Sequence, residues 1–221
     1  MRFVTILGRN LRAIARGRDG VALVEFAYSL PIMALLAFTG LELVNYVTAH
    51  LRVNQIAISL ADNASRAKQE VVGSNPRFRE LDANESIRAA QLQGGNLDLA
   101  EHGRVILSSL EVNDDGGQWI HWQRCGGALS NRSRYGDEGT GRTGTDFGGM
   151  GIGTRNVRSE ENFAIMYAEV YYDYQPLVLP NFVSGQTIYK SAAMYVRDDR
   201  DLSGKGIFDP EPRVDAKSLC G

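Results

Sequence analysis

The chain has 221 residues, of which 43% are hydrophobic and 23% are charged, and this ordinary globular composition excludes a wholly disordered protein. Its formal net charge of −2 excludes both a strongly basic nucleic-acid-binding protein and a strongly acidic solvating chain. The charge is nevertheless uneven, because residues 1–20 contain five arginines and a single acidic residue, Asp19. Arginines beside a hydrophobic span are held on the cytoplasmic side of a membrane, so we interpret residues 1–20 as a basic cytoplasmic leader.

A hydrophobic segment follows the leader directly. Sixteen residues, Phe26–Leu41, pass without a charge, and the apolar stretch widens to residues 21–49 if Glu25 and Glu42 are allowed. A helix over residues 21–49 reaches about 43 Å, more than the hydrocarbon core of about 30 Å. We therefore predict a transmembrane helix over this range. The alternative is a secretory signal cleaved after Val47-Thr48-Ala49, but an ordinary signal has no acidic residues in its apolar segment.

The start of the apolar segment carries the most specific motif in the chain. Gly20 precedes four residues that lead into Glu25-Phe26-Ala27, with Leu30-Pro31 farther along and Gly40-Leu41-Glu42 at the far end. This pattern resembles the TadE-like minor pilins of the tight-adherence (Tad/Flp) pilus. The resemblance implies that a prepilin peptidase cleaves after Gly20 on the cytoplasmic face. Val21 then becomes the mature N-terminus, and the hydrophobic helix is retained.

Glu25 also has a physical reason to have a partner. A carboxylate in a membrane helix costs about 2.5–3.5 kcal/mol on insertion scales and is usually paired. Cleavage after Gly20 creates a free α-amino group, and we predict that this group pairs with Glu25, in the same chain or in a neighbouring subunit. A surface carboxylate without a partner is the alternative. Pro31 lacks an amide hydrogen, so we predict a helix kink there, which membrane helices tolerate when neighbours satisfy the freed carbonyl.

Beyond the span, the helix is predicted to continue into water as an amphipathic extension over residues 50–70. Its apolar side chains fall on one stripe at three- and four-residue spacing: Val53, Ile56, Ala57, Leu60, Ala64 and Ala67. Packing of this stripe on the protein's own head is favoured over packing on a partner helix. A break at residues 73–76 precedes a second helix, predicted over 83–93, which Asp82 caps and Gly94-Gly95 ends.

Residues 71–221 are predicted to form an extracytoplasmic head. Alternating side chains indicate four strands, over residues 104–112, 118–123, 163–174 and 188–196. A glycine-rich connection over residues 126–161 shows no convincing strand or helix, and is either a contact or adhesion surface or a flexible excursion. The predicted fold class is α+β, with the long helix packed on a small antiparallel sheet, an arrangement that also resembles pilin heads.

None of the enzyme-like signals has the context that its chemistry needs. Gly136–Thr143 differs by one letter from a phosphate-binding loop, but arginine replaces the lysine and no strand precedes it or helix follows it. His50, His102 and His121 lack metal-ligand spacing, and we interpret His121 as an edge or interface residue. Residues 197–201 lack the spaced acids of a calcium loop and are interpreted as a solvated charge run. We therefore expect no enzyme, no cofactor and no metal site.

The two cysteines, Cys125 and Cys220, both lie in the predicted head. A head outside the cytoplasmic membrane is in a compartment where disulfides persist. An even count of two therefore favours one intramolecular disulfide, and two unrelated thiols are the alternative. The resemblance to TadE-like proteins adds modest weight, because paired cysteines are frequent in their heads.

The resemblance implies a minor pilin or pseudopilin that acts structurally in pilus assembly. The expected location is the bacterial inner membrane, crossed once, with the N-terminus in the cytoplasm and the head in the periplasm or on an extracellular pilus. The expected partners are other pilins, the Tad assembly machinery, the prepilin peptidase and membrane lipid, with no nucleic acid. The alternative is a permanently anchored periplasmic binding or adhesion module that does not polymerise, and a membrane-tethered hydrolase ranks third.

Overall fold

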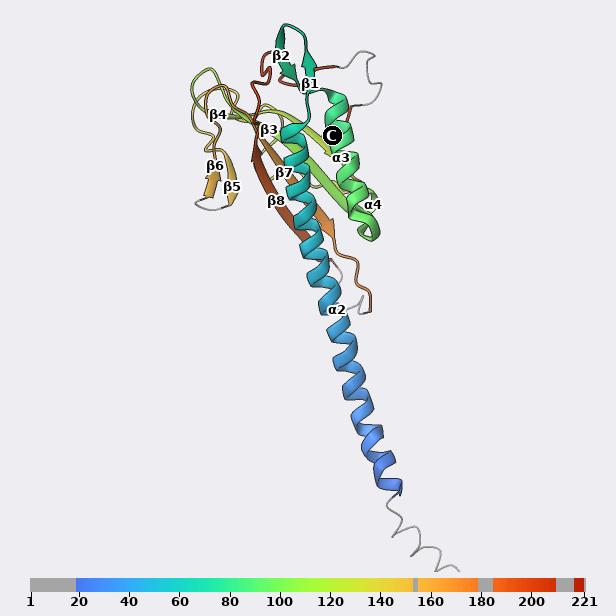
Figure 1. Cartoon of the computed structure of the whole chain (residues 1–221). Coiled ribbons are helices and arrows are strands. Elements are labelled where there is room, and N and C mark those ends of the chain that lie inside the picture. The colour runs from blue at the N-terminus through green and yellow to red at the C-terminus, as the bar shows by residue number, and fades with distance from the viewer. Residues whose placement is uncertain (1–18, 153–154, 179–184, 210–216, 221) are drawn as a thin grey trace, which may run out of the picture.

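The computed structural model describes residues 19–152, 155–178, 185–209 and 217–220, and residues 1–18 of the predicted leader lie outside these ranges. Helix α2 (Asp19–Arg66) has 48 residues. Its N-terminal half extends away from the rest of the molecule, and its C-terminal half lies against a sheet (Figure 1). The predicted span and the predicted amphipathic extension are therefore one continuous helix, which ends before residue 70 because residues 69–71 form a strand.

The sheet contains four antiparallel strands in the order β4-β3-β7-β8. The strands are β3 (Gly103–Val112), β4 (Gln118–Gly126), β7 (Ile165–Asp173) and β8 (Thr187–Tyr195). Their positions confirm the four predicted strands, because period-two alternation marks strands whose two faces meet different surroundings. The fold class is α+β, with a long apolar N-terminal helix and a small antiparallel sheet.

The main core lies between helix α2 and one face of the sheet. Five residues of the predicted stripe are at most 1% exposed there, namely Val53, Ile56, Ala57, Leu60 and Ala64. They meet the face of β7 and its flanks that the alternation predicts, which carries Ala164, Met166, Ala168, Val170, Tyr172 and Tyr174. The stripe therefore packs on the protein's own head, as predicted. Ala67 lies beyond the end of α2 and is partly buried against the same core.

Helix α3 (Glu80–Gly94) begins three residues earlier than predicted. Asp82 does not precede the helix but lies in its first turn, where it accepts the backbone N–H of Arg79 at 2.9 Å. The same carboxylate accepts from the Arg79 guanidinium at 2.7 Å, so Asp82 caps the N-terminus of α3 from a position inside the first turn. The predicted end is confirmed, because α3 stops at Gly94 and Gly95 has a φ of 53°, which glycine adopts without strain.

Short elements connect the larger ones. The predicted break at residues 73–76 falls within a two-stranded hairpin of β1 (Gln69–Val71) and β2 (Ser74–Arg77), which lies at the end of the head opposite to the exposed half of α2 (Figure 1). A 3-10 turn, η1 (Gly95–Leu97), and helix α4 (Leu99–His102) lead from α3 into β3.

Arg200 closes the C-terminal end of α2. Its side chain is buried, and its guanidinium donates to the carbonyls of Ser65 and Ala67 at 3.1 and 2.9 Å. The last carbonyls of a helix have no donors within it, and a cation is favoured there by the helix dipole. The interpretation of residues 197–201 as a solvated charge run is therefore wrong for Arg200, which supplies the donors that the helix end needs.

The glycine-rich connection covers the second face of the sheet. It contains a short hairpin of β5 (Met150–Ile152) and β6 (Arg155–Val157), so the expectation that it forms no strand is wrong. Four of its apolar side chains, Tyr135, Phe147, Met150 and Val157, pack against the sheet residues Leu110, Ile120, Ile165 and Tyr167. Short strands held by contacts with a distant sheet leave no local periodicity for the sequence to reveal.

Glu169 shows how completely this second face is covered. The alternation of β7 predicts it on a polar face, yet its side chain is fully buried. Its Oε1 accepts from the Tyr189 hydroxyl at 3.0 Å and from the backbone N–H of Arg134 at 3.2 Å. Burial raises the pKa of the Glu169 carboxyl above its usual range. Strand β7 is thus buried on both faces because the connection folds back as a layer.

Candidate functional site

The N-terminal half of α2 exposes an apolar surface. From Gly20 to Leu41 every residue is exposed except Ala34, which is half-buried. The mean hydropathy of its most apolar window is 2.0, and none of that window is buried. Within the described ranges, α2 alone is long and apolar enough to cross a membrane. The 22 residues from Gly20 to Leu41 extend about 33 Å, close to the hydrocarbon thickness of about 30 Å.

The residues of the predicted processing site lie in the first turns of this exposed half. Gly20 has open space where a side chain would project. Val21 and Phe26 are 55% and 61% exposed, and Glu25 is exposed between them. The structure therefore leaves all four residues accessible at the far end of the helix from the head (Figure 1).

Pro31 lies inside α2, which continues through it as one helix. Its missing amide hydrogen leaves the carbonyl of Ala27 without a donor from the helix itself. In lipid, neighbouring helices or hydroxyl side chains satisfy such a carbonyl. Ser29 donates to the Phe26 carbonyl at 3.2 Å, so it does not satisfy Ala27. The predicted kink at Pro31 stays a prediction.

Two glutamates of α2 lie in opposite environments, Glu25 near the start of the exposed half and Glu42 directly after its end. Glu25 has no hydrogen-bond or ion-pair partner among the residues that the structure describes. Glu42 is only 4% exposed, and its Oε1 accepts from the Tyr174 hydroxyl at 2.5 Å. Its Oε2 accepts the backbone N–H of Val178 at 2.8 Å, and Asn45 donates to the Tyr174 oxygen at 2.8 Å. Burial and the adjacent carboxylate raise the pKa of Tyr174 to about 12.

The role of Glu42 was not predicted from the sequence, although a signal was present. An acidic residue at the end of an apolar helix is expensive unless donors surround it. Its donors come from a segment more than 130 residues later in the chain, which no local pattern identifies.

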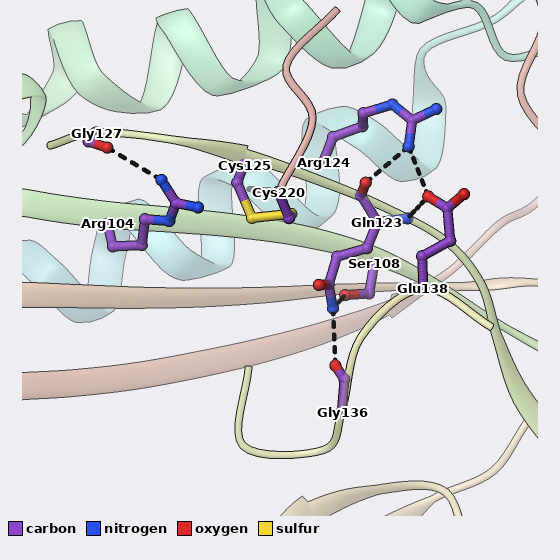
Figure 2. Close-up of a disulfide and its surroundings, with 9 residues drawn as sticks. All are labelled: Arg104, Ser108, Gln123, Arg124, Cys125, Gly127, Gly136, Glu138 and Cys220. Atoms are coloured by element: carbon purple, nitrogen blue, oxygen red, sulfur yellow. Dashed lines mark hydrogen bonds and ion pairs between the residues drawn. A yellow bond between two sulfur atoms is a disulfide. The ribbon is translucent and has the colours of Figure 1, made fainter. Parts of the chain in front are cut away.

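The predicted disulfide is present. Cys125, near the end of β4, is bonded to Cys220 (Figure 2). Their Cα atoms are 4.9 Å apart, and their sequence separation is 95. The C-terminal segment also pairs with β4 through its backbone, because the N–H of Cys125 donates to the Ser218 carbonyl at 2.7 Å. The disulfide and this pairing together cover part of the outer edge of β4, which is an edge strand of the sheet.

Next to the disulfide, Arg124 joins three parts of the head. Its guanidinium donates to the buried carboxylate of Glu80 in α3 at 2.6 and 2.7 Å. It also donates to Glu138 of the glycine-rich connection at 2.8 Å and to the Gln123 carbonyl at 2.7 Å (Figure 2). Burial alone would lower the pKa of Arg124, but the hydrogen bonds and charges of Glu80 and Glu138 raise it. The arginine therefore stays charged and fixes α3, β4 and the connection to one another.

His121 lies on the edge strand β4, but it is buried rather than presented to a partner. Its Nδ1 is 2.7 Å from Glu111 Oε2 and its Nε2 is 3.1 Å from the Gly204 carbonyl. Both partners accept hydrogen bonds, and Ser109 donates to the other oxygen of Glu111 at 2.6 Å. Burial alone would lower the pKa of His121, but its hydrogen bond to Glu111 and the charge of that carboxylate raise it. A doubly protonated ring satisfies both contacts.

The segment Gly136–Thr143 has no phosphate-binding geometry. It follows a turn at residues 134–135 rather than a buried strand, and it leads into a bend and irregular chain rather than a helix. Its carbonyls are used within the head, since Gly136 accepts from the Gln123 side chain at 3.2 Å (Figure 2). The Gly141 carbonyl likewise accepts from the Asn113 side chain at 2.7 Å. In the described ranges, no three His, Cys, Asp or Glu side chains are grouped as metal ligands.

Comparisons with known proteins identify no relative of this chain. No family model matches the chain, and no curated protein and no solved structure matches it.

Proposed function

We propose that this protein is a TadE-like minor pilin or pseudopilin that acts in the assembly of a tight-adherence pilus. In this proposal, the leader lies in the cytoplasm, α2 crosses the bacterial inner membrane once, and the head lies in the periplasm. The prepilin peptidase removes the leader after Gly20, and the retained helix packs with other pilin helices through its exposed half.

The observation that carries the proposal is the contrast between the two glutamates of α2. Glu42 obtains its donors from its own head, whereas Glu25 lies in an exposed apolar helix without a partner in the described residues. A carboxylate in an apolar membrane helix is usually paired, so we expect Glu25 to pair with a group outside the described residues. The amino group of Val21 after cleavage, or that of a neighbouring subunit, supplies one.

The head supports a structural rather than a catalytic role. Both faces of its sheet are covered, and a disulfide and a buried arginine hold its layers together. Such a head presents a fixed outer surface to other subunits. The pilin-like layout of a long helix under an antiparallel sheet adds support for the same class.

A permanently anchored binding module is the second candidate. One feature favours it: a pocket of about 510 Å³ between β4, the glycine-rich connection and the C-terminal segment, with Trp119, Arg142 and Lys205 in its wall. Its wall carries four basic side chains against the two carboxylates of Glu80 and Glu138, and this excess of positive charge suits a small acidic ligand.

Mass spectrometry of the N-terminus separates the two candidates. Protein extracted from membranes of cells with an active prepilin peptidase is expected to begin at Val21, and Gly20→Val is expected to block cleavage. Gly40→Val is the matched control, because Gly40 is also in α2 with open space around it. Recovery of the full-length chain from those cells would exclude pilin-like processing and favour the anchored module.

A further inference from the structure

The connection between β7 and β8 returns to helix α2 at the level of Glu42. Tyr174 directly follows β7, and its hydroxyl donates to the Glu42 carboxylate. The backbone N–H groups of Leu177 and Val178 point to the same carboxylate, at 3.4 and 2.8 Å. The start of this connection, residues 174–178, is therefore fixed against one turn of α2.

This turn of α2 is where the part that is exposed on all sides ends. Beyond it the head covers one side of the helix, and Leu43, Val44 and Val47 stay exposed on the other. Gly20–Leu41 matches the thickness of a hydrocarbon core, and Glu42 is the next residue. The proposed function requires α2 to span the membrane, and if the hydrocarbon core covers Gly20–Leu41, Glu42 lies at the boundary between acyl chains and headgroups. Residues 174–178 lie at the same level, because they bind Glu42 directly.

The outward side of residues 175–178 suits that boundary. The segment Tyr174–Val178 contains no charged residue, and the Leu177 side chain is 70% exposed. Tyr174 packs edge-on against Tyr46 of α2, with ring centroids 5.0 Å apart. Tyr174 itself is buried in the core, so it fixes the segment against α2 and does not face outward.

We propose that residues 175–178 form a lipid-contact surface that seats the head on the outer leaflet of the membrane, with Leu177 inserted at the boundary between headgroups and acyl chains. Glu42 is the positioning residue of this surface, because its two oxygens hold the segment at the correct depth. The proposal rests on α2 spanning the membrane. It assigns to the head a second membrane contact, which limits its tilt around the helix.

Site-directed spin labelling tests this contact on the full chain in vesicles of phosphatidylcholine and phosphatidylglycerol. The two native cysteines are disulfide-bonded, so a single added cysteine takes the label under non-reducing conditions. Leu177→Cys reports on the proposed contact. Leu92→Cys on α3 is the matched control because Leu92 is 72% exposed, and Leu35→Cys reports on the span.

In the expected result, the label at position 177 collides more often with oxygen than with a water-soluble nickel chelate, and the label at 92 shows the reverse. Adding Glu42→Ala is expected to shift the label at 177 toward the behaviour at 92. A label at 177 that behaves like the one at 92, while the label at 35 is in lipid, would overturn the lipid contact alone. A label at 35 that collides mainly with the nickel chelate would overturn the span, and with it the proposed function.

Discussion

Arg124 holds Glu80 through two hydrogen bonds, of 2.6 and 2.7 Å, at a place where both side chains are at most 5% exposed. A buried carboxylate that loses its cation keeps its desolvation cost and loses the compensation. This relationship makes α3 and the sheet depend on each other for stability.

Arg124→Met is therefore expected to lower the free energy of unfolding by about 3 kcal/mol, the lower end of the range for a broken buried pair. The lower end applies because Lys217 Nζ lies 3.6 Å from Glu80 and compensates in part. Arg66→Met is the control, since Arg66 is 64% exposed in its pair with Asp62 and is expected to cost about 0–1 kcal/mol. Urea unfolding of the full chain in detergent micelles measures both, and equal losses would contradict the prediction.

The disulfide is expected to stabilise the head by closing a long loop. Replacing both Cys125 and Cys220 with serine is expected to lower the free energy of unfolding by about 4–5 kcal/mol on the loop-entropy model, while membrane insertion is unchanged. Non-reducing peptide mapping of periplasm-exposed protein checks the pairing itself. Two thiols that react freely with an alkylating reagent in the non-reduced protein would refute it.

His121 predicts a specific pH dependence. Because Glu111 raises the folded-state pKa of His121, the pair contributes fully below the unfolded value of about 6.5, and its contribution falls as the pH rises through the folded pKa. The charge of Glu138 acts in the same direction. The wild type is expected to lose stability relative to His121→Gln as the pH rises above about 6.5. Tryptophan fluorescence follows the unfolding, because Trp119 is stacked on His121 with ring centroids 4.1 Å apart and Trp122 lies in the core. A pH-independent difference between the two proteins would count against the prediction.

Glu25→Ala is expected to leave leader cleavage and membrane insertion intact but to reduce pilus number. The substitution removes the proposed partner of the new N-terminus and leaves Gly20 in place. Glu70→Ala is the control, because it removes an exposed carboxylate from β1 of the head. Electron microscopy measures the number of pili per cell. Normal numbers in the Glu25 variant would show that this carboxylate is not an assembly contact.

Tyr174→Phe is expected to lower the free energy of unfolding by about 1.5–3 kcal/mol, because it removes a hydrogen bond to a buried carboxylate. Tyr195→Phe is the matched control. The Tyr195 hydroxyl donates to an exposed carbonyl of Arg158, so its loss is expected to cost less than about 0.5 kcal/mol. Similar values for the two variants in micelles would show that the Tyr174 bond does not contribute to docking of the head on α2.

The elements that could be predicted are those with a periodic pattern of their own. The stripe from Val53 to Ala64 and the alternation of β7 each mark a buried face, and the structure places these faces against each other. The start of α3 was missed because an aspartate can cap a helix either from the residue before it or from within its first turn. Only the contact of Asp82 with Arg79 shows that it lies in the first turn. The hairpin of β1 and β2 was missed because its strands have three and four residues, too few for alternation to be visible.

The sequence alone determined the long apolar helix and the four main strands, because each depends on residues close together in the chain. It also determined the disulfide, because two cysteines allow a single pairing. The second layer of the head, the donors around Glu42 and the cap that Arg200 places on α2 do not follow from such patterns. In each of these, a polar group or a glycine-rich stretch is stabilised by residues far away in sequence, some more than 130 positions distant. Their energy comes from burial and hydrogen bonds that exist only after the chain has folded, so the tertiary structure alone could reveal them.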